Sequence, residues 1–549
     1  MNEIKPGATI APVIIATDKT QLTQFSGNKA AYPVYLTIGN IPKSLRRKPS
    51  AHATILIAYL SVDKIDRKKM SDHERRSRVQ RVFHESMRLV LEPLIGAGKK
   101  GVEMISSDGS VRDVFPLLTC YVADYPEQCL VACTKYCTCP KCRAPSDGLQ
   151  EAHAAEPRNQ QWTATIIESA KAKADGNHRV FHDECMSSDV AGSVYKPFWY
   201  DFPLCDIHQA ITPDVLHQLY QGVFKHLVGW CQKALGPTKL DERIRCLPPA
   251  FGLRHFKNGF SALSQISGPE RKQMAKILLG CLVGSMPKSG IQAVTALLDF
   301  IYIAQYPAHD TDTLHYLQDA LERFHQHRHY FLQVGVREDF NIPKFHSLVH
   351  YVDSIKAFGT TDNYNTEMFE RLHIDFAKHG WRASNHRDEF PQMIRWLSRQ
   401  EKINSFEKYL SGTSTESVED LTTSSDSARD GILLAKYPHH PNRPISHLLD
   451  KYQAHNFDYH LKLYLSKFQT NPVTSRLLDL HALPFTKVDV YDMFRFHPDS
   501  LQDGEKEKDI AKAMPPSKQL PHGRFDPVVV MVSDEAESTG LAGQYFHID

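Results

Sequence analysis

Three widely separated acidic positions have the residue types and surroundings expected of a divalent-metal site. Asp18 directly follows the apolar run at 12–17, and Asp124 closely follows another apolar run at 114–122. A third acid would come from a later helix, where Glu367 and Glu370 are three positions apart and therefore share one helical face. Carboxylates bind Mg²⁺ and Mn²⁺, and a pair of such ions can activate the attacking oxygen and stabilise the leaving oxygen of a phosphodiester. The pattern predicts two-metal phosphodiester chemistry, provided that the fold brings these acids together.

A second group of candidate ligands consists of four cysteines in the run CTKYCTCPKC: Cys133, Cys137, Cys139 and Cys142. A Cys-Pro-Lys-Cys turn presents two thiolates on one side of a tight knuckle, which suits tetrahedral zinc. The other two ligands would be Cys133 and Cys137, or would come from a later group, His178, His182 and Cys185. A redox Cys-x-x-Cys pair normally begins a helix after a strand, and that context is absent here. We predict zinc, with plain structural cysteines as the alternative.

Asp214 and His217 form a third feature, in the segment Asp-Val-Leu-His. Thr212 and Pro213 are typical of a helix cap and a first helical residue, so both side chains would lie near a helix start. An aspartate is favourable there because of the helix dipole, and the histidine one turn later can simply be packed. The functional alternative is a pair that binds metal or fixes the fold beside the active site.

The elements that must position these residues form an α/β unit in the first 130 residues. In chain order we expect three strands, a helix and a fourth strand, at 12–17, 32–38, 53–62, 72–95 and 114–122. Gly96, Gly98 and Gly101 are expected to end the helix. This order is the opening of an RNase H-like fold, in which the first and fourth strands are neighbours. Asp18 and Asp124 would then share one metal ion.

The remaining chain reads as an insertion, a catalytic helix and an accessory region. We expect the first half of an RNase H-like core at 1–130, a zinc-knuckle and mainly helical insertion at 131–345, and the C-terminal catalytic helix of the core at 346–410. A Ser/Thr-rich and acidic stretch predicts a flexible linker at 411–430. An accessory region is expected at 431–549, with a mobile Pro/Lys-rich tail around 503–523.

Composition limits the partners and the compartment. The net charge of +2 indicates that any DNA contact comes from local basic patches, such as Lys43, Arg46, Arg47 and Lys48 or the run that begins at Arg67. No apolar run is long enough to span a bilayer, and no secretory leader opens the chain. The eleven cysteines are odd in number and confined to 120–281, which favours a reducing, intracellular compartment.

Several long stretches resemble the Plavaka transposases of basidiomycete fungi, which are related to the KDZ and CACTA-type elements. The resemblance runs from about residue 10 to about 405. Its most specific stretches are PVIIATDKTQLT, YPVYLTIGNIPKSLRRKPS, VADYPEQCLVACTKYCTCPKC, ITPDVLHQLYQGVFKHLVGW and FGTTDNYNTEMFERLHIDFAKHGWRASNHRDEFPQM.

The resemblance implies a DDE/D transposase core with a helical insertion before the last catalytic helix. Related enzymes carry a DFPA-like segment ahead of a Cys-Pro-x-Cys knuckle, and here Asp124-Tyr-Pro-Glu precedes the knuckle in that order. This supports Asp124 as the second acid, with Asp214 as the alternative. The Phe-Glu-Arg pattern of the relatives falls on Glu370, with Glu367 as the fallback, and their Asp-x-x-His element falls on Asp214 and His217.

We therefore expect a metal-dependent DNA endonuclease and strand transferase that acts on transposon ends in the nucleus. It would use two Mg²⁺ or Mn²⁺ ions and a structural Zn²⁺, bind double-stranded DNA, and assemble on it as a homo-oligomer. Almost nothing precedes the first strand, so we expect a truncated copy that lacks an N-terminal DNA-binding region. The alternatives are a catalytically inactive DNA-binding protein derived from a transposase, and an unrelated zinc-stabilised interaction protein.

Overall fold

The computed structural model describes residues 4–23, 29–63, 70–106, 108–250 and 253–413, together with shorter stretches between 434 and 547. The chain forms two compact units, Met1–Tyr409 and Leu410–Asp549. The basic run at 67–69 and most of the expected linker, 414–430, lie outside the described residues.

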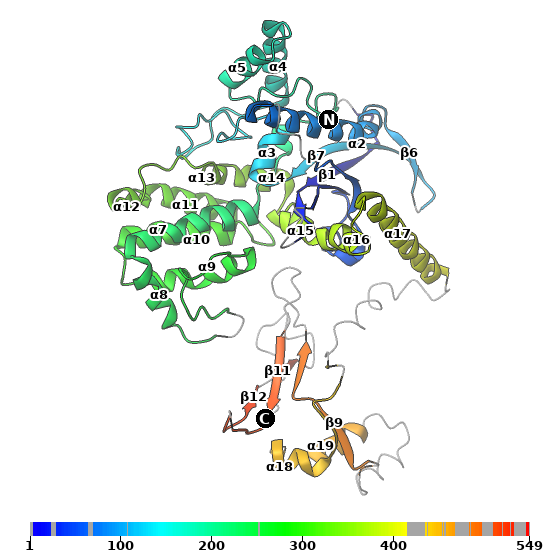
Figure 1. The fold of residues 1–549 in the computed structure, drawn as a ribbon, viewed down its shortest axis with the longest axis vertical. Coiled ribbons are helices and arrows are strands. Elements are labelled where there is room, and N and C mark those ends of the chain that lie inside the picture. Colours follow the sequence, from blue (N-terminus) through cyan, green and yellow to red (C-terminus); the bar gives the residue numbers. More distant parts are fainter. Residues whose placement is uncertain are drawn as a thin grey trace. The chain divides into compact units, whose positions relative to one another are not determined.

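A five-stranded sheet organises the first unit (Figure 1). Its strands, in the spatial order β5-β4-β1-β7-β6, are β5 (Ile55–Tyr59), β4 (Pro33–Ile38), β1 (Thr9–Thr17), β7 (Val111–Val122) and β6 (Val102–Ile105). The central strand β1 is antiparallel to β4 and parallel to β7. The carboxyl ends of β1 and β7 therefore lie at the same edge of the sheet. Two short strands, β2 (Thr20–Gln21) and β3 (Ala30–Ala31), form a separate hairpin.

One face of the sheet is covered by the long helix α2 (Asp72–Lys100). Ser71 caps it by accepting a hydrogen bond from the backbone N–H of Glu74. Apolar residues at helical spacing, Phe83, Met87 and Leu91, form one core cluster with alternate residues of β1. Apolar residues recur every second position in the strand and every three to four positions in the helix. Both sets therefore face each other in a single buried layer.

Two details of this region differ from the sequence expectation. The helix was predicted to stop from Gly96 onward, but it continues to Lys100 and ends at Gly101, whose φ is +76°. Gly98 instead permits close packing, because a Cβ atom there would lie 2.9 Å from the carbonyl oxygen of Pro116. The edge strand β6, which pairs antiparallel with β7, was not predicted.

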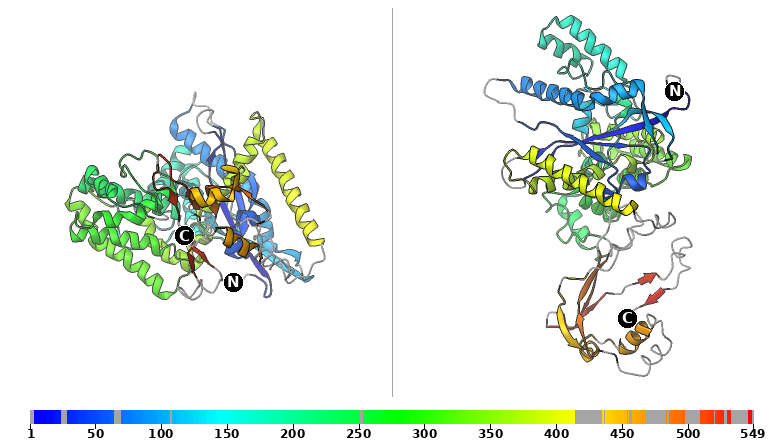
Figure 2. Two further views of the ribbon diagram at one scale, coloured as in Figure 1. Left: turned by 90° about the horizontal axis from the view of Figure 1, so that it is seen from below. Right: turned by 90° about the vertical axis from the view of Figure 1, so that its right-hand side faces the viewer.

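The opposite face of the sheet carries α15 (Thr366–His373). Phe369 and Leu372 of this helix form a core cluster with Ile14 and Ala16, which alternate with the β1 residues that face α2. The right-hand view of Figure 2 shows the sheet between the blue helix α2 and the yellow-green helices of 366–413. After α15 come η5 (Ile374–Lys378), α16 (His379–Arg382) and the long α17 (Glu389–Thr413).

A helical region lies between β7 and α15 in the sequence, and part of it has its own large core. Its first helices are α3 (Tyr125–Val131), α4 (Gln160–Ala174), α5 (His178–Ser187), α6 (Ile207–Ala210) and the π-helix η2 (Val215–Phe224). The core cluster extends over η2 and the helices that follow: α7 (Lys225–Leu235), α8 (Pro237–Arg245), α9 (Gly268–Leu282), α10 (Lys288–Ile303), α11 (Thr311–His327) and α12 (His329–Gln333). Short turns then lead back to the sheet: α13 (Pro343–His346), η3 (Ser347–His350), α14 (Tyr351–Phe358) and η4 (Thr361–Asn363). Two further short turns, α1 (Lys43–Arg46) and η1 (Pro49–Ala51), connect β4 to β5.

The described part of the second unit contains short strands and two helices. Its helices are α18 (Ile445–Tyr452) and α19 (Phe457–Ser466), and its strands are β8 (His440–Pro444), β9 (Lys487–Val490), β10 (Met493–Phe496), β11 (Asp509–Met514), β12 (Arg524–Phe525), β13 (Val529–Met531) and β14 (Tyr545–His547). The strands β11 and β12 fall in or beside the segment for which we expected a mobile tail. No helix among the described residues of the chain combines the length and apolar character needed to cross a membrane.

Candidate active site and metal centre

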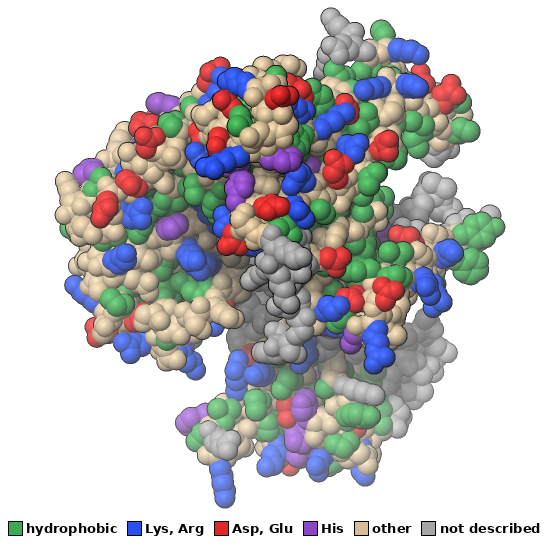
Figure 3. Space-filling view, turned by 45° about the horizontal axis from the view of Figure 1, so that its top comes forward, with side chains coloured by type: hydrophobic (Ala, Val, Ile, Leu, Met, Phe, Trp, Pro, Cys, Tyr) green, Lys and Arg blue, Asp and Glu red, His purple; other side chains and the backbone are tan. Residues whose placement is uncertain are grey.

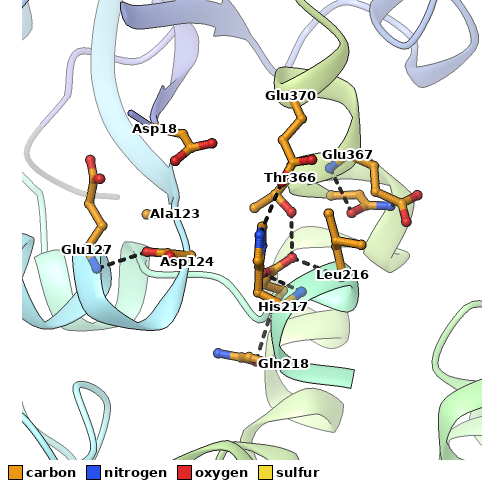
Figure 4. Close-up of polar contacts among 12 residues, drawn as sticks. Asp18, Ala123, Asp124, Glu127, Leu216, His217, Gln218, Thr366, Glu367 and Glu370 are labelled. Atoms are coloured by element: carbon orange, nitrogen blue, oxygen red, sulfur yellow. Dashed lines mark hydrogen bonds and ion pairs between the residues drawn. The ribbon is translucent and has the colours of Figure 1, made fainter. Parts of the chain in front are cut away.

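Asp18 and Asp124 lie at the ends of the two parallel central strands. The register pairs Ala16 with Val122, and two residues further along each strand are the two aspartates. Asp124 also caps α3, because its carboxylate accepts a hydrogen bond from the backbone N–H of Glu127 at 3.1 Å. Burial raises the pKa of Asp124, and the nearby charges of Asp18 and Asp214 add to that effect. The fold therefore brings the first two predicted acids to one place (Figure 4).

The helix α15 supplies Glu370 on its side toward this edge of the sheet. Glu370 Oε1 lies 3.2 Å from Nε2 of His217. One turn earlier, Thr366 donates a hydrogen bond from Oγ1 to Asp214 Oδ1 at 2.6 Å. Figure 4 shows Glu370 and Thr366 extending from α15 toward the Asp214–His217 segment. Glu370 and the Asp-x-x-His feature are thus parts of one polar network.

His217 is held between two carboxylates. Its Nδ1 lies 2.7 Å from Asp214 Oδ2, and its Nε2 faces Glu370. Burial alone would lower the pKa of His217, but the hydrogen bonds that it donates to Asp214 and Glu370 outweigh burial and raise the pKa to about 11. His217 is therefore an imidazolium at neutral pH.

Asp214 is the cap of the helix that follows, instead of Thr212. Its two carboxylate oxygens accept hydrogen bonds from the backbone N–H groups of Leu216 and His217, at 3.1 and 2.9 Å. We placed the cap at Thr212 because a proline follows it. The aspartate carries a charge and reaches two N–H groups, so it satisfies the helix start better. Asp214 is 1% exposed.

His373 is a site residue that the sequence reading missed. Its Nε2 lies 3.2 Å from Asp18 Oδ2, and its Nδ1 lies 2.9 Å from the hydroxyl of Tyr35 on β4. The ring is 4% exposed. A signal was present in the sequence, because His373 follows Glu370 by three positions and so shares its helical face.

Glu367, the fallback third acid, points to a different neighbour. Its carboxylate lies 2.8 Å from Nζ of Lys272 and accepts a hydrogen bond from the side-chain amide of Asn365. Figure 4 shows its carboxylate on the side of α15 away from Asp18. Of the two glutamates, Glu370 is the one that joins the network of the aspartates.

A half-buried carboxylate, Glu127, lies beside the two aspartates. Its oxygen accepts a hydrogen bond from the hydroxyl of Thr17, which in turn contacts the hydroxyl of Tyr121 at 2.8 Å. Burial raises the pKa of Glu127 to about 8. The polar network therefore continues beneath the ends of β1 and β7.

The described residues contain one compact group of potential metal ligands, Cys139, Cys142, His346 and His350. Their ligand atoms all lie within 4.8 Å of one another, and all four residues are buried. Cys139 Sγ lies 3.2 Å from His350 Nε2, and Cys142 Sγ lies 3.1 Å from His346 Nε2. Two thiolates and two imidazoles form a donor set that suits tetrahedral Zn²⁺, so this group could bind zinc.

The surroundings of this group favour a thiolate at Cys142 and hold the knuckle and one histidine in place. Hydrogen bonds from Cys139, His346 and His350 lower the pKa of the Cys142 thiol, whereas burial raises that of Cys139. His346 Nδ1 faces the carbonyl oxygen of Leu149 at 3.2 Å, which orients its other nitrogen toward the thiols. Arg158 donates hydrogen bonds to the carbonyl oxygens of Cys139 and Cys142 at 2.9 and 3.1 Å, which fixes the knuckle.

The other predicted zinc ligands lie outside this group. Cys133 Sγ is 3.6 Å from His84, and Cys137 is exposed with φ at +71°. His178 faces Tyr195, His182 faces the carbonyl oxygen of Gly192, and Cys185 is buried in a small core cluster. The two histidines of the group, His346 and His350, were not predicted from the sequence. They form a His-x-x-x-His spacing in the run HSLVH. That spacing is a zinc-ligand signal, but it stands far from the cysteines in the sequence.

The basic patch at 43–47 lies against the segment that precedes α15. Lys43 and Arg47 lie 3.1 and 2.9 Å from a carboxylate oxygen of Asp362. Arg46 is buried and donates a hydrogen bond to the side-chain oxygen of Asn363 at 2.7 Å. We had considered these residues for DNA contacts, but much of their hydrogen-bonding capacity is used within the fold.

Comparison with known families identifies the first part of the chain. No curated protein matches it. The family model described as Plavaka transposase matches residues 1–231. The match includes both aspartates at the strand ends, both knuckle cysteines and the Asp-x-x-His feature. Transposases in general are enzymes that bind and cut DNA, so the match points to that class of protein. Over residues 1–231, this chain is therefore similar to the Plavaka transposases.

Proposed function

We propose that the chain is the catalytic region of a DDE-type transposase, in which Asp18, Asp124 and Glu370 hold two Mg²⁺ or Mn²⁺ ions. One observation carries the proposal: α15 is bonded to the end of β1 through His373 and Asp18, one turn from Glu370. That bond connects α15, which carries Glu370, to Asp18 at the end of β1. The register of β1 and β7 aligns Asp124 with Asp18 at the same edge of the sheet. When bound, the ions would activate the nucleophile and stabilise the leaving oxygen.

We further propose that the sheet is an RNase H-like core. Three antiparallel strands, a helix and a strand parallel to the first follow one another as β1, β4, β5, α2 and β7. One feature departs from a simple form of that plan. The edge of the sheet next to β7 is occupied by β6, which precedes β7 in the sequence and pairs with it as a hairpin. The proposed core comprises 1–130 and 346–410, with 131–345 as its insertion.

The side chains around the acids have positioning roles in this proposal. His217 and Asp214 hold Glu370 and the start of α15 in place, and His373 orients the carboxylate of Asp18. The three carboxylates do not form as compact a group as the cysteines and histidines do within the described residues. Each carboxylate is bonded to a separate donor: Asp18 to His373, Asp124 to the backbone N–H of Glu127, and Glu370 to His217.

We propose a structural Zn²⁺ bound by Cys139, Cys142, His346 and His350. These residues come from the segment after α3 and from the turns that precede α14. A zinc ion there would join the segment that follows the second acid to the segment that leads to the third. Its role would be to brace the insertion against the core.

The DNA partners, the assembly and the compartment follow from the same proposal. The substrates would be double-stranded transposon ends and target DNA, bound by a homo-oligomer in the nucleus. Strand transfer requires two DNA ends to be held together, which favours an assembly of more than one copy on DNA.

The test uses the purified full chain and two assays: Mn²⁺ binding followed by electron paramagnetic resonance, and Mn²⁺-dependent nicking of supercoiled DNA. We expect Asp18→Asn, Asp124→Asn and Glu370→Gln each to weaken Mn²⁺ binding and to abolish nicking. Glu367→Gln is the matched control, because it makes the same chemical change three positions away on the same helix.

Two outcomes would count against this function. Equal losses in Glu367→Gln and Glu370→Gln would contradict the assignment of the third acid. DNA binding without any Mn²⁺-dependent nicking, in all variants and in the wild type, would support the catalytically inactive DNA-binding alternative.

A further inference from the structure

A cavity of about 580 Å³ lies beside the middle of β1 and β7. Its floor includes Ile14 of β1 with Leu118 and Cys120 of β7, and its walls come from the segments at 204–210 and 357–364. Asp18 and Asp124 lie beyond the ends of the same strands, so this cavity is separate from the candidate active site. Its volume lies in the range of small-molecule sites.

Arg46 places a buried positive charge on the wall of this cavity. It is 5% exposed, and its guanidinium donates hydrogen bonds to the carbonyl oxygen of Ile41 and to Asn363. Within the described part of the chain it forms no ion pair. Burial lowers the pKa of Arg46, and the nearby Asp362 is already paired with two other cations. A buried charge without a partner is costly, and an anion in the cavity would compensate it.

Tyr364 provides an unpartnered hydrogen-bond donor on the same wall. The residue is 1% exposed, and its hydroxyl has no hydrogen-bond partner among the residues that the structure describes. Cys120 and Asp362 are near both Tyr364 and Arg46, so the two donors lie in one neighbourhood. Burial raises the pKa of Cys120 to about 12, so its thiol is neutral and leaves the charge of Arg46 uncompensated.

The backbone around the cavity is irregular in two places. The register of β1 and β7 shifts between Val13 and Ile14, which leaves Thr119 as an extra residue at the cavity floor. Leu204, on the rim, has φ at +51° and remains 47% exposed. Bulges and left-handed bulky residues are retained where a local shape is needed, which is common at binding sites.

We propose that this cavity binds a small organic anion, whose charged group accepts hydrogen bonds from Arg46 and Tyr364 and whose apolar part packs on Ile14 and Leu118. The buried charge of Arg46 and the unpartnered hydroxyl of Tyr364 favour an acceptor-rich anionic group, and the apolar floor favours a carbon skeleton over a bare inorganic ion. A DNA duplex is too wide to enter a cavity of this volume. The inference does not depend on the proposed catalytic function.

The test measures binding of 2-naphthoate and of its neutral analogue 2-naphthamide to the full chain by isothermal titration calorimetry. We expect 2-naphthoate to bind about tenfold more tightly than 2-naphthamide, because one charge-assisted hydrogen bond is worth about that factor. Arg46→Gln should remove this preference. Ala357→Phe fills the cavity from an exposed lining position. It should weaken the binding of 2-naphthoate by about tenfold or more without altering Arg46.

The matched controls are Ala172→Phe, at an exposed helical alanine outside the cavity, and Arg112→Gln, at an exposed arginine of β7. Both should bind 2-naphthoate as the wild type does. Equal affinity for the two probes, or wild-type binding by Ala357→Phe, would overturn the proposal. Displacement of 2-naphthoate by a short DNA duplex would also overturn it, because the cavity would then be part of a DNA contact. Should Arg46→Gln fail to fold, Ala357→Phe and the probe pair still decide the question.

Discussion

At the scale of single residues, histidines contact two of the three candidate acids. His373 lies against Asp18, and His217 lies against Glu370. An imidazole has two nitrogens, so one can hold a carboxylate while the other is fixed by a neighbour. That neighbour is the hydroxyl of Tyr35 for His373 and the carboxylate of Asp214 for His217. The network thus sets the direction of each acid as well as its position.

His373→Gln tests this positioning role. We expect DNA nicking to fall roughly 10–100-fold, the usual cost of removing a group that orients a metal ligand. The Mn²⁺ concentration for half-maximal rate should rise, whereas the KM for DNA should stay unchanged. Tyr35→Phe should show the same pattern to a smaller degree, because the ring remains and only the hydroxyl is lost.

The control is His379→Gln, at a more exposed histidine of α16. A loss of kcat without any change in the Mn²⁺ requirement would point to a purely structural role for His373. The same result for His379→Gln as for His373→Gln would also contradict the positioning role.

The raised pKa of His217 makes stability depend on pH. The pKa is about 11 in the folded protein and 6.5 for an ordinary histidine, so the folded state binds the additional proton between these values. The stabilising contribution is complete below about pH 6.5 and decreases as the pH rises toward 11. Urea unfolding at pH 6, 7.5 and 9 should therefore show a larger advantage of the wild type over His217→Gln at pH 6 than at pH 9. A constant difference would show that folding does not shift the pKa of His217.

At the scale of elements, the position of α15 depends on contacts at both of its ends. Its start is held by the bond from Thr366 to Asp214 and by the contacts of Lys43 and Arg47 with Asp362. Its end is held by His373. The turns before α14 carry His346 and His350, so the cysteine knuckle is connected to the same stretch of chain. The short helix α15 is thereby fixed by elements from three regions of the sequence.

Removal of zinc should loosen this arrangement. We expect the full chain to contain one equivalent of Zn²⁺ by mass spectrometry, and a chelator to lower the Tm. Cys142→Ala and His350→Ala should each lose the metal and lower the Tm, since structural zinc contributes directly to folding. Cys137→Ala is the matched control within the same cysteine run and should keep the metal. Equal zinc content in Cys137→Ala and Cys142→Ala would contradict the ligand assignment.

At the scale of the whole molecule, charge is nearly balanced. The net charge is +2, and on the face drawn in Figure 3 cationic and anionic side chains are interspersed. Several of the cations at 43–47 are also engaged inside the fold. DNA binding by this chain would therefore depend on a limited number of local phosphate contacts.

The salt dependence of DNA binding measures that number. Each phosphate contact contributes a slope of about −0.9 to the plot of log affinity against log salt concentration. We expect a negative slope that corresponds to only a few contacts. The measurement uses a duplex of random sequence at about 50 to 200 mM salt, which spans roughly the physiological range. A slope near zero would contradict phosphate-mediated binding, and a slope typical of a polycation would contradict the local character of the contacts.

The sequence by itself determined the local features of this protein. The apolar runs specify β1, β4, β5 and β7, and the periodic apolar face specifies α2, because strand and helix periods are properties of neighbouring residues. Asp18 and Asp124 could be placed at strand ends, and α15 could be recognised as the helix of Glu370. The Cys-Pro-Lys-Cys knuckle was likewise visible as half of a metal site.

Only the tertiary structure decided which distant residues meet. His346 is 204 positions from Cys142, and His373 is 355 positions from Asp18. A histidine beside apolar residues has the same local pattern whether it packs in a core or faces a thiol or a carboxylate. The edge strand β6 and the passage of α2 beyond Gly96 also depend on neighbours from elsewhere in the chain. Local periodicity sets the elements, whereas partner choice depends on contacts between segments that the linear order does not relate.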